Sequence, residues 1–313
     1  MSKKTAVFLA GFGGPETPAE VRPFIESVAH GAHIPPERLE IVTRHYEKIG
    51  GRSGYNGITF KQRDALAKFF KKKNLPLEVV AGFMHSHPSF KQVFLEMQKK
   101  GTERALVFVL SSFRSYPSFE RYRERLEEAR KTASAEKVDL EYAGPFHDHP
   151  LFIEAVAGRV LETLKMMPNE ERSKTHFIFT AHSIPADWAD KSDYADEFQA
   201  CAELVAKKMT LGSWDVAYQS RSGPPKYPWL EPDVNEAIRD LPRGKCKGIA
   251  LIPIGFLSDN AEVLYDLDIE ARKTAEACGL RYSRALTVMD HPAFIEMIAS
   301  LIAQRSDYLV KPQ

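Results

Sequence analysis

The chain has 313 residues, of which 43% are apolar and 27% are charged, as is usual for a soluble globular protein with one large or two medium domains. Its formal net charge is +1, so no strong field of one sign favours binding to nucleic acid or to an acidic membrane surface. No apolar segment approaches the length of a membrane span.

The predicted elements begin close to the start of the chain. The short apolar run there leads into Gly-Gly-Pro and lacks a convincing cleavage site, so it indicates a first strand rather than a signal peptide. Short runs rich in β-branched and aromatic residues then alternate with helical patterns. The expected strands are Ala6–Ala10, Glu78–Phe83, Ala105–Leu110, Asp139–Ala143, His176–Thr180, Asp215–Gln219, Gly248–Pro253 and Tyr282–Leu286. The clearest expected helices are Thr59–Lys72, Phe119–Lys131, Ala195–Met209 and Ala261–Cys278. This alternation predicts an α/β fold with parallel sheets flanked by helices.

The order of these elements is duplicated. The sequence HPLFIE at His149–Glu154 recurs as HPAFIE at His291–Glu296, and each copy follows a fourth strand and opens a closing helix. The first strand of each half also ends in a proline-containing loop. The repeat predicts two Rossmann-like domains, residues 1–150 and 151–313. In open α/β sheets ligands bind beyond the carboxyl ends of the strands, so the two proline loops mark the expected site. The chain has no GxGxxG or Walker motif to indicate a nucleotide.

The three cysteines, Cys201, Cys246 and Cys278, are far apart in the sequence and form no CxxC pair. This spacing argues against a disulfide framework or a cysteine-rich metal site and fits a reducing cytoplasm. We expect them to be buried structural thiols.

The first candidate for chemistry is His182, at the end of an apolar run that predicts a buried strand. An imidazole there can take a proton near neutral pH or bind a divalent transition metal. A histidine that merely caps the strand through hydrogen bonds is an equal alternative.

The second candidate is an acidic row in the last long helical pattern. Glu262, Asp266 and Glu270 are four residues apart, so they share one helix face. Three like charges repel each other, and the row is a plausible route for a hydrated divalent cation. A merely solvated acidic face is the competing interpretation.

The third candidate is the proline-rich loop Tyr218–Pro232. It is stiff, and it carries aromatic faces together with Arg221 and Lys226. Such a loop could stack on a flat macrocycle while a cation meets its carboxylates. A purely structural role is the alternative. In the first half, His85 and His87 could be metal ligands, but we expect both to form hydrogen bonds instead.

Taken together, these segments resemble the ferrochelatase family over nearly the whole chain. The resemblance is carried by Gly13–Thr17, Tyr46–Gly51, Gly82-Phe83 with His87-Pro88, Ala181–Pro185, Gln219–Arg221 with Pro228–Leu230, and Ser258-Asp259 with Glu262, Leu264 and Tyr265. It implies two Rossmann-like domains with a porphyrin cleft between them. It also implies a lyase of haem biosynthesis, which inserts ferrous iron into protoporphyrin IX to form protohaem.

The same resemblance assigns roles to individual residues. His182 matches the family's active-site histidine, a proton acceptor, a metal ligand or both, and Glu262 matches the glutamate that faces it. Asp266 and Glu270 match acidic residues that continue along a partly π-type helix, and these four residues form the implied metal set. The implied substrate-binding residues are Phe12, Arg114, Ser115, Gln219, Ser220, Trp229 and Phe256. Iron is then a substrate, and neither an organic cofactor nor a [2Fe–2S] cluster is expected.

Several positions depart from familiar members. Phe12 stands where some members have Tyr or Met, Asn260 replaces a frequent His, and Ser111–Ser115 differs from the usual tyrosine-containing segment. The missing tyrosine favours protoporphyrin IX over coproporphyrin III. A coproporphyrin III ferrochelatase, a cobalt chelatase and a porphyrin- or haem-binding paralogue without turnover remain alternatives. No nucleic-acid partner is expected. The oligomeric state is left open, as is a peripheral membrane contact through an apolar lip at Phe24–Ile34.

Overall fold

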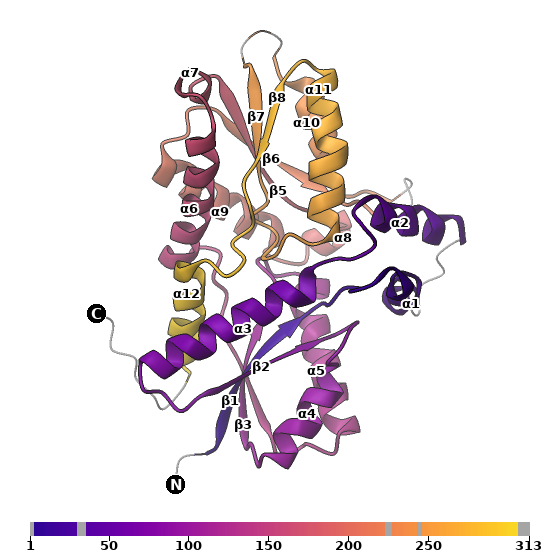
Figure 1. Cartoon of the computed structure of the whole chain (residues 1–313), viewed down its shortest axis with the longest axis vertical. Coiled ribbons are helices and arrows are strands. Elements are labelled where there is room, and N and C mark those ends of the chain that lie inside the picture. The colour runs from indigo at the N-terminus through magenta and orange to yellow at the C-terminus, as the bar shows by residue number, and fades with distance from the viewer. Residues whose placement is uncertain (1–2, 30–35, 223–226, 243, 245, 306–313) are drawn as a thin grey trace. The chain divides into compact units, whose positions relative to one another are not determined.

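The computed structural model describes residues 3–29, 36–222, 227–242, 244 and 246–305. All eight predicted strands are present, and they form two parallel four-stranded sheets (Figure 1). The first sheet has the order β2-β1-β3-β4, with β1 at Thr5–Gly11, β2 at Glu78–Phe83, β3 at Arg104–Val109 and β4 at Asp139–Tyr142. The second has the order β6-β5-β7-β8, with β5 at Thr175–His182, β6 at Trp214–Gln219, β7 at Gly248–Ile252 and β8 at Arg281–Arg284. The predicted fold class, two Rossmann-like α/β domains, is confirmed.

Helices follow the strands as the sequence predicts. Those of the first half are α1 (Pro18–Val28), α2 (Pro36–Lys48), α3 (Tyr55–Lys72), α4 (Phe90–Lys99), the π-helical turn η1 (Tyr116–Glu120) and α5 (Arg121–Thr132). Those of the second half are α6 (Pro150–Met166), α7 (Asn169–Arg172), α8 (Ala186–Ala189), α9 (Tyr194–Met209), α10 (Val234–Asp240), the π-helix η2 (Val263–Ala271), α11 (Arg272–Ala277) and α12 (Pro292–Ala303).

The predicted duplication extends from strand order to individual hydrogen bonds. The second strand of each half closes its following loop in the same way: Phe83 N–H donates to Pro88 O at 2.9 Å, and Tyr218 N–H donates to Pro232 O at 2.9 Å. Each loop leads directly into a helix whose side-chain N-cap is Ser89 in one case and Asp233 in the other. The repeat is therefore structural.

The two His-Pro motifs also have one local structure. His149 and His291 are the N-caps of α6 and α12, and each Nδ1 accepts a hydrogen bond from the backbone N–H two residues later, at 3.2 Å. Proline follows at the first helical position, where its missing N–H costs no hydrogen bond.

The compact units exchange these two closing helices. One unit comprises Met1–Ser111, Pro117–Pro145 and Asp290–Gln313, and the other comprises Ser112–Tyr116 and Phe146–Met289. The chain thus passes between the units more than once, and a single boundary at residue 150 does not describe them. The physical reason is packing: the Phe294 ring of α12 lies 6.3 Å from that of Phe108 in β3, and the Phe113 ring lies 5.6 Å from that of Phe198 in α9.

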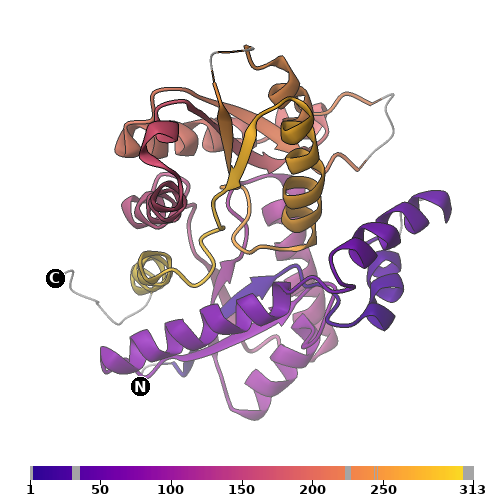
Figure 2. The ribbon, with the colours of Figure 1, turned by 45° about the horizontal axis from the view of Figure 1, so that its top comes forward.

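The helical pattern at Ala261–Cys278 forms one continuous helix, which contains the nine-residue π segment η2 and continues as α11, in agreement with the partly π-type helix that the resemblance implied. Its buried residues Val263, Leu267, Ala271 and Ala275 are four apart and pack in the core of the second sheet. A stripe with this spacing exceeds the 3.6-residue α-helical turn, and wider π turns accommodate it. The two segments form one continuous column beside β8 (Figure 2).

The cysteine expectation holds for one residue of three. Cys201 is buried in α9, whereas Cys246 is only partly buried and Cys278 is exposed. Cys278 lies outside the core because it is the C-terminal cap of α11, where the helix reaches the surface.

The segment proposed as an apolar lip can be followed only to residue 29, because residues 30–34 lie outside the described part of the chain. Within α1, Val21 and Ile25 are buried, and the Phe24 ring contacts those of Phe12 and Tyr46 at 6.2 Å. This part is an ordinary helix packed on its own unit. Within the described ranges, no helix combines the length and the apolar character that crossing a membrane requires.

Candidate functional site

The candidate site is built around a histidine and a carboxylate at the carboxyl end of the second sheet. His182 is the last residue of β5, the strand between β6 and β7. Glu262 directly precedes η2, and its Oε1 lies 3.7 Å from His182 Nε2. The two side chains are 30% and 46% exposed, so both are accessible to solvent and to a ligand. The predicted catalytic pair therefore does come together.

The hydrogen bond at the other ring nitrogen orients the imidazole. His182 Nδ1 is bonded to the backbone carbonyl of Ser183, and a carbonyl oxygen only accepts, so Nδ1 carries a hydrogen. A neutral ring then directs the lone pair of Nε2 towards the Glu262 carboxylate. Such a pair holds a proton or a cation between its members. First-row divalent cations bond nitrogen and oxygen at about 2.0–2.2 Å, so one ion can contact both atoms.

A buried tyrosine that the sequence did not identify supports this strand end. Tyr194, at the start of α9, donates its hydroxyl hydrogen to His182 O at 2.8 Å. Burial raises the pKa of this phenol above its usual range, so it remains a donor. No local motif reveals the role, because Tyr194 belongs to a separate helix that reaches the strand only through folding.

Gln219 was expected to line the porphyrin site, but it is only 1% exposed and instead links three elements. Its Oε1 accepts from Thr180 Oγ1 in β5 at 2.9 Å, and its Nε2 lies 3.4 Å from both Ser220 Oγ and Glu262 O. The side-chain amide of Gln219 therefore holds β5, Ser220 and the backbone of Glu262 together. Thr180 was not identified, although its position two residues before His182 places both side chains on one face of the strand.

Ser220 and Asp266 form the next part of the site. Ser220 Oγ donates a hydrogen bond to Asp266 Oδ2 from a backbone with φ of 64°, a conformation that is uncommon for a residue other than glycine. Burial raises the pKa of Asp266 to about 7; the Ser220 hydrogen bond opposes this shift, and the charges of Glu262 and Glu270 add to it. This carboxyl can thus hold or release a proton near neutral pH.

Glu270 has a different environment from the rest of the predicted metal set. It is exposed and lines a surface groove of about 1260 Å³ together with Asn235, Arg239 and Lys273. Across the described residues, no three or more histidine, cysteine, aspartate or glutamate side chains are grouped so that they could hold one ion. His182, Glu262, Asp266 and Glu270 are thus a row of separate groups, not one ligand cluster.

Arg114 and Ser115 do not offer free side chains to a ligand. Arg114 Nε lies 2.7 Å from Glu197 Oε1, its backbone N–H lies 2.7 Å from Glu197 Oε2, and its Nη2 lies 2.8 Å from Asp193 Oδ2. Glu197 is buried in α9, so this arginine fixes the segment Ser112–Tyr116 to α9. Ser115 is only 2% exposed. Both were expected to bind substrate, but the structure shows packing and ion pairing instead.

Trp229 lies on a segment that pairs with the loop after His182. It forms an isolated antiparallel bridge with Pro185, and Leu230 N–H donates to Ile184 O at 3.0 Å. Trp229 is partly buried, and within the described part of the chain no partner lies in hydrogen-bond reach of its indole N–H. Phe256 packs partly buried against the core of the second sheet. The predicted carboxylate-binding role of Lys226 lies outside the described residues, and Arg221 donates to Tyr227 O at 3.1 Å.

In the first unit, Phe12 follows β1, and its ring contacts those of Phe24 at 6.2 Å and His85 at 4.8 Å. His85 Nδ1 pairs with Ser27 Oγ at 3.0 Å, and His87 Nδ1 pairs with Gln92 Oε1 at 3.0 Å, which confirms the expected hydrogen bonding of both. Burial, with smaller contributions from Arg121 and Arg125, lowers the pKa of His85 to about 4.

Comparison with known proteins agrees with this arrangement. The family model described as Ferrochelatase matches residues 4–306. The chain belongs to the ferrochelatase family. A Ferrochelatase of Rhodopirellula baltica is 37% identical over 95% of this chain and 85% of its own length. A Coproporphyrin III ferrochelatase of Mycobacterium leprae is also 37% identical, over 95% of this chain and 88% of its own. Members of this family are metal-insertion enzymes of the lyase class.

Solved structures support the chelatase fold. SirB from Bacillus subtilis with Fe3+ matches with a TM-score of 0.60 and 13% identity, over 96% of this chain and 97% of its own. DR2241 from Deinococcus radiodurans, which has structural similarity to chelatases, matches with a TM-score of 0.60 and 15% identity, over 97% of this chain and 55% of its own. At these identities the match concerns the fold alone.

Proposed function

We propose that this ferrochelatase-family chain inserts ferrous iron into protoporphyrin IX to form protohaem, and that His182 and Glu262 carry the reaction. The observation that supports the proposal most is the 3.7 Å approach of His182 Nε2 to Glu262 Oε1 at an accessible strand end. A neutral imidazole and an ionised carboxylate are the two kinds of group that can either ligate iron or accept a proton.

The reaction needs both abilities. Ferrous iron must lose water ligands, and two pyrrole N–H protons must leave as the metal enters the ring. In the proposed sequence, Glu262 and His182 first hold the ion at the ring face. As the iron leaves them to bond to the ring nitrogens, the freed lone pair of His182 Nε2 accepts one pyrrole proton and the Glu262 carboxylate accepts the other. The hydrogen bond from Nδ1 to Ser183 O keeps Nε2 directed at the reacting atoms throughout.

Asp266 and Glu270 are proposed as the outer part of the metal route. A carboxyl whose pKa is about 7 can exchange a proton for a cation at neutral pH, and so suits transient binding. The lack of a described three-ligand group also suits a route, since an ion held by fewer protein ligands leaves more readily.

One feature of the second unit supports protoporphyrin IX as the ring. Coproporphyrin III carries more carboxylates and needs more cationic partners. Of the cations expected from the sequence, Arg114 is already paired with Glu197 and Asp193, and Arg221 donates to Tyr227 O. Few carboxylate anchors are therefore available from the predicted residues.

Coproporphyrin III is the second candidate ring, because several relatives at 36% to 38% identity are named Coproporphyrin III ferrochelatase. No organic cofactor and no [2Fe–2S] cluster form part of the proposal, and the cytoplasm is the proposed location.

An anaerobic insertion assay tests the proposal. Purified protein is mixed with ferrous iron and either protoporphyrin IX or coproporphyrin III, and loss of porphyrin fluorescence is followed. Turnover with protoporphyrin IX is expected, and turnover with coproporphyrin III alone would correct the ring. Parallel reactions with cobalt and zinc identify a chelatase of other metals. Tight porphyrin binding without turnover of any metal would instead make the chain a binding protein.

A further inference from the structure

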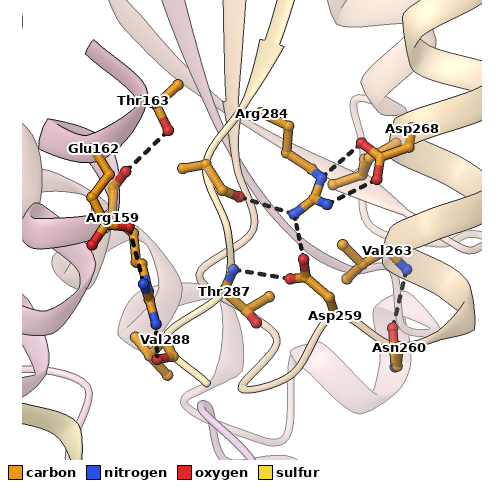
Figure 3. A network of polar contacts seen from close by, with 12 residues as sticks. Arg159, Glu162, Thr163, Asp259, Asn260, Val263, Asp268, Arg284, Thr287 and Val288 are labelled. Carbon is orange, nitrogen blue, oxygen red and sulfur yellow. Dashed lines mark hydrogen bonds and ion pairs between the residues drawn. The ribbon is translucent and has the colours of Figure 1, made fainter. Parts of the chain in front are cut away.

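A buried arginine at the edge of the second sheet binds both ends of the segment that carries Glu262 and Asp266. Arg284 is the last residue of β8, and its side chain is only 7% exposed. Its Nε and Nη2 each donate to one oxygen of Asp268 in η2, at 2.8 Å (Figure 3). This two-point contact fixes the planar guanidinium against the carboxylate plane.

The other edge of the same guanidinium faces the loop before η2. Arg284 Nη1 lies 3.0 Å from Asp259 Oδ2 and donates to Ala285 O at 3.1 Å. The second oxygen of Asp259 accepts from Thr287 N–H at 3.0 Å. Asp259 is only 12% exposed, so both of its oxygens are held inside the protein, one by the last residue of β8 and the other by the chain that follows it.

The positions of the two aspartates relate the Arg284 contacts to the proposed metal route. Asp259 precedes Glu262, and Asp268 follows Asp266, so two of the four groups of the metal row lie on the stretch between the two aspartates that Arg284 contacts. A second contact comes from the same strand: Tyr282 donates its hydroxyl hydrogen to Leu267 O at 2.6 Å. Tyr282 and Arg284 are two residues apart and share one strand face, so β8 holds η2 at two successive residues.

We propose that Arg284 is a positioning residue for metal insertion, which holds Glu262 at its distance from His182 by fixing Asp259 and Asp268 together. This inference rests on the proposed function, since it assigns Arg284 a role in that reaction. Arg284 reaches no reacting atom in the proposal and acts through the two aspartates.

The chemistry of the guanidinium makes this role specific to arginine. Only a planar group with donors along two edges can bind both oxygens of Asp268 and also reach Asp259. A lysine ammonium keeps the positive charge and so still compensates part of the buried negative charge, but it cannot form this set of bonds. Arg284→Lys therefore separates geometry from charge.

The test compares Arg284→Lys with Arg281→Lys as a matched control. Arg281 begins the same strand, but its side chain is 68% exposed and pairs with Glu171 on the surface. For Arg284→Lys we expect kcat for iron insertion to fall about 10-fold to 100-fold through misplacement of Glu262, with the KM for the ring within about twofold of the parent. Arg281→Lys should retain parental values.

A readout that does not depend on turnover accompanies the kinetics. Amide hydrogen exchange across residues 259–268 should be about tenfold faster or more in Arg284→Lys than in Arg281→Lys, at a temperature where both are folded. If residues 259–268 of Arg284→Lys exchanged at the parental rate, Arg284 would not be what holds Asp259 and Asp268 in place, whether or not the protein is a chelatase. Faster exchange with parental kcat would show a purely structural contact and overturn the positioning role. If the parent inserts no metal, the proposed function and this role fail together. The exchange data still decide whether Arg284 holds Asp259 and Asp268 in place.

Discussion

The loops after β1 and β5 occupy the same place in the duplicated fold and differ in chemistry. After β1, the backbone is enclosed by side chains: Phe12 N–H donates to Tyr55 Oη at 3.1 Å, and Asn56 bonds both the N–H and the C=O of Gly14 at 3.0 Å. After β5, the backbone is also held, but the strand ends in His182, which faces a carboxylate across 3.7 Å.

The difference shows how one scaffold can supply structure in one copy and reactivity in the other. The first loop has close packing, since a Cβ added at Gly14 would lie 2.5 Å from the Ser53 Cβ. Its nearby histidine, His85, has a pKa lowered to about 4 by burial and stays neutral. The second loop leaves its histidine accessible, and the segment after β7 brings the Glu262 carboxylate to it. We therefore propose that proton and metal chemistry belong to the second copy.

The largest expected effect comes from comparing the substitution of one histidine in each copy. His182→Ala should lower kcat/KM for iron insertion by about 10²-fold to 10⁴-fold, because it removes a proton acceptor and a metal ligand together. His87→Ala is the control substitution in the first copy, on the loop after β2, where the ring pairs with Gln92, and it should stay within about threefold of the parent. Steady-state anaerobic assays measure both. Similar losses in the two variants would contradict the assignment of chemistry to one copy.

The next effect tests the structural role of the first loop. Asn56 is 2% exposed and bonds Gly14 twice and Ser86 Oγ at 2.8 Å. Asn56→Ala should lower the free energy of unfolding by about 2–4 kcal/mol, since it removes the acceptor of the Gly14 N–H and one of the two donors to Gly14 O, the other being Ser86 Oγ. Urea unfolding measures this loss.

Asn260→Ala is the comparison in the second copy, on the loop after β7. Its side chain bonds one backbone amide, Val263 N–H, at 3.0 Å, so it should cost only about 1 kcal/mol while it slows insertion through Glu262. If Asn56→Ala and Asn260→Ala lowered the free energy of unfolding equally, the proposed difference between the two copies would be wrong.

The last effect concerns the pH dependence of stability, and it disappears at low pH. The pKa of Asp266 is raised to about 7, whereas an unfolded aspartate titrates near 3.9. Between these values the folded chain holds more protons, so Asp266 makes the free energy of unfolding fall as pH rises towards 7.

Asp266→Asn removes this titration. The variant should be more stable than the parent by about 1–3 kcal/mol at pH 8 and equal to it near pH 4, with the exposed Asp240→Asn as control. Urea unfolding at both pH values measures the difference. A variant that is less stable than the parent at pH 8 would contradict the raised pKa.

Much of the fold could be predicted from local sequence. The strands were recognisable because apolar β-branched runs such as His176–Thr180 belong to sheets covered on both faces. The two His-Pro motifs revealed the duplication because N-cap and proline chemistry act within a few residues. His182 could be singled out as a polar group at the end of an apolar strand, whereas Glu262 was distinguished from a solvated acidic face only by the resemblance to the ferrochelatase family.

The rest depended on contacts between distant residues. Gln219 was expected at a ligand surface, but Thr180 and η2 enclose it, and nothing in its own loop encodes those neighbours. Arg114 was expected to bind substrate, but its partner Glu197 lies on a helix far along the chain. The contacts of Arg284 could not be predicted for the same reason. An arginine at a strand end indicates an exposed cation until its partners Asp259 and Asp268 are known.

The most direct test of the central claim is a double-mutant cycle at the two groups of the site. Insertion of ferrous iron is measured anaerobically for the parent, His182→Ala, Glu262→Gln and the double variant. If His182 and Glu262 act as one unit on the same ion and proton, the double variant should be about as slow as the slower single variant. If the two losses multiply, the groups act independently, and the account of a shared site is wrong.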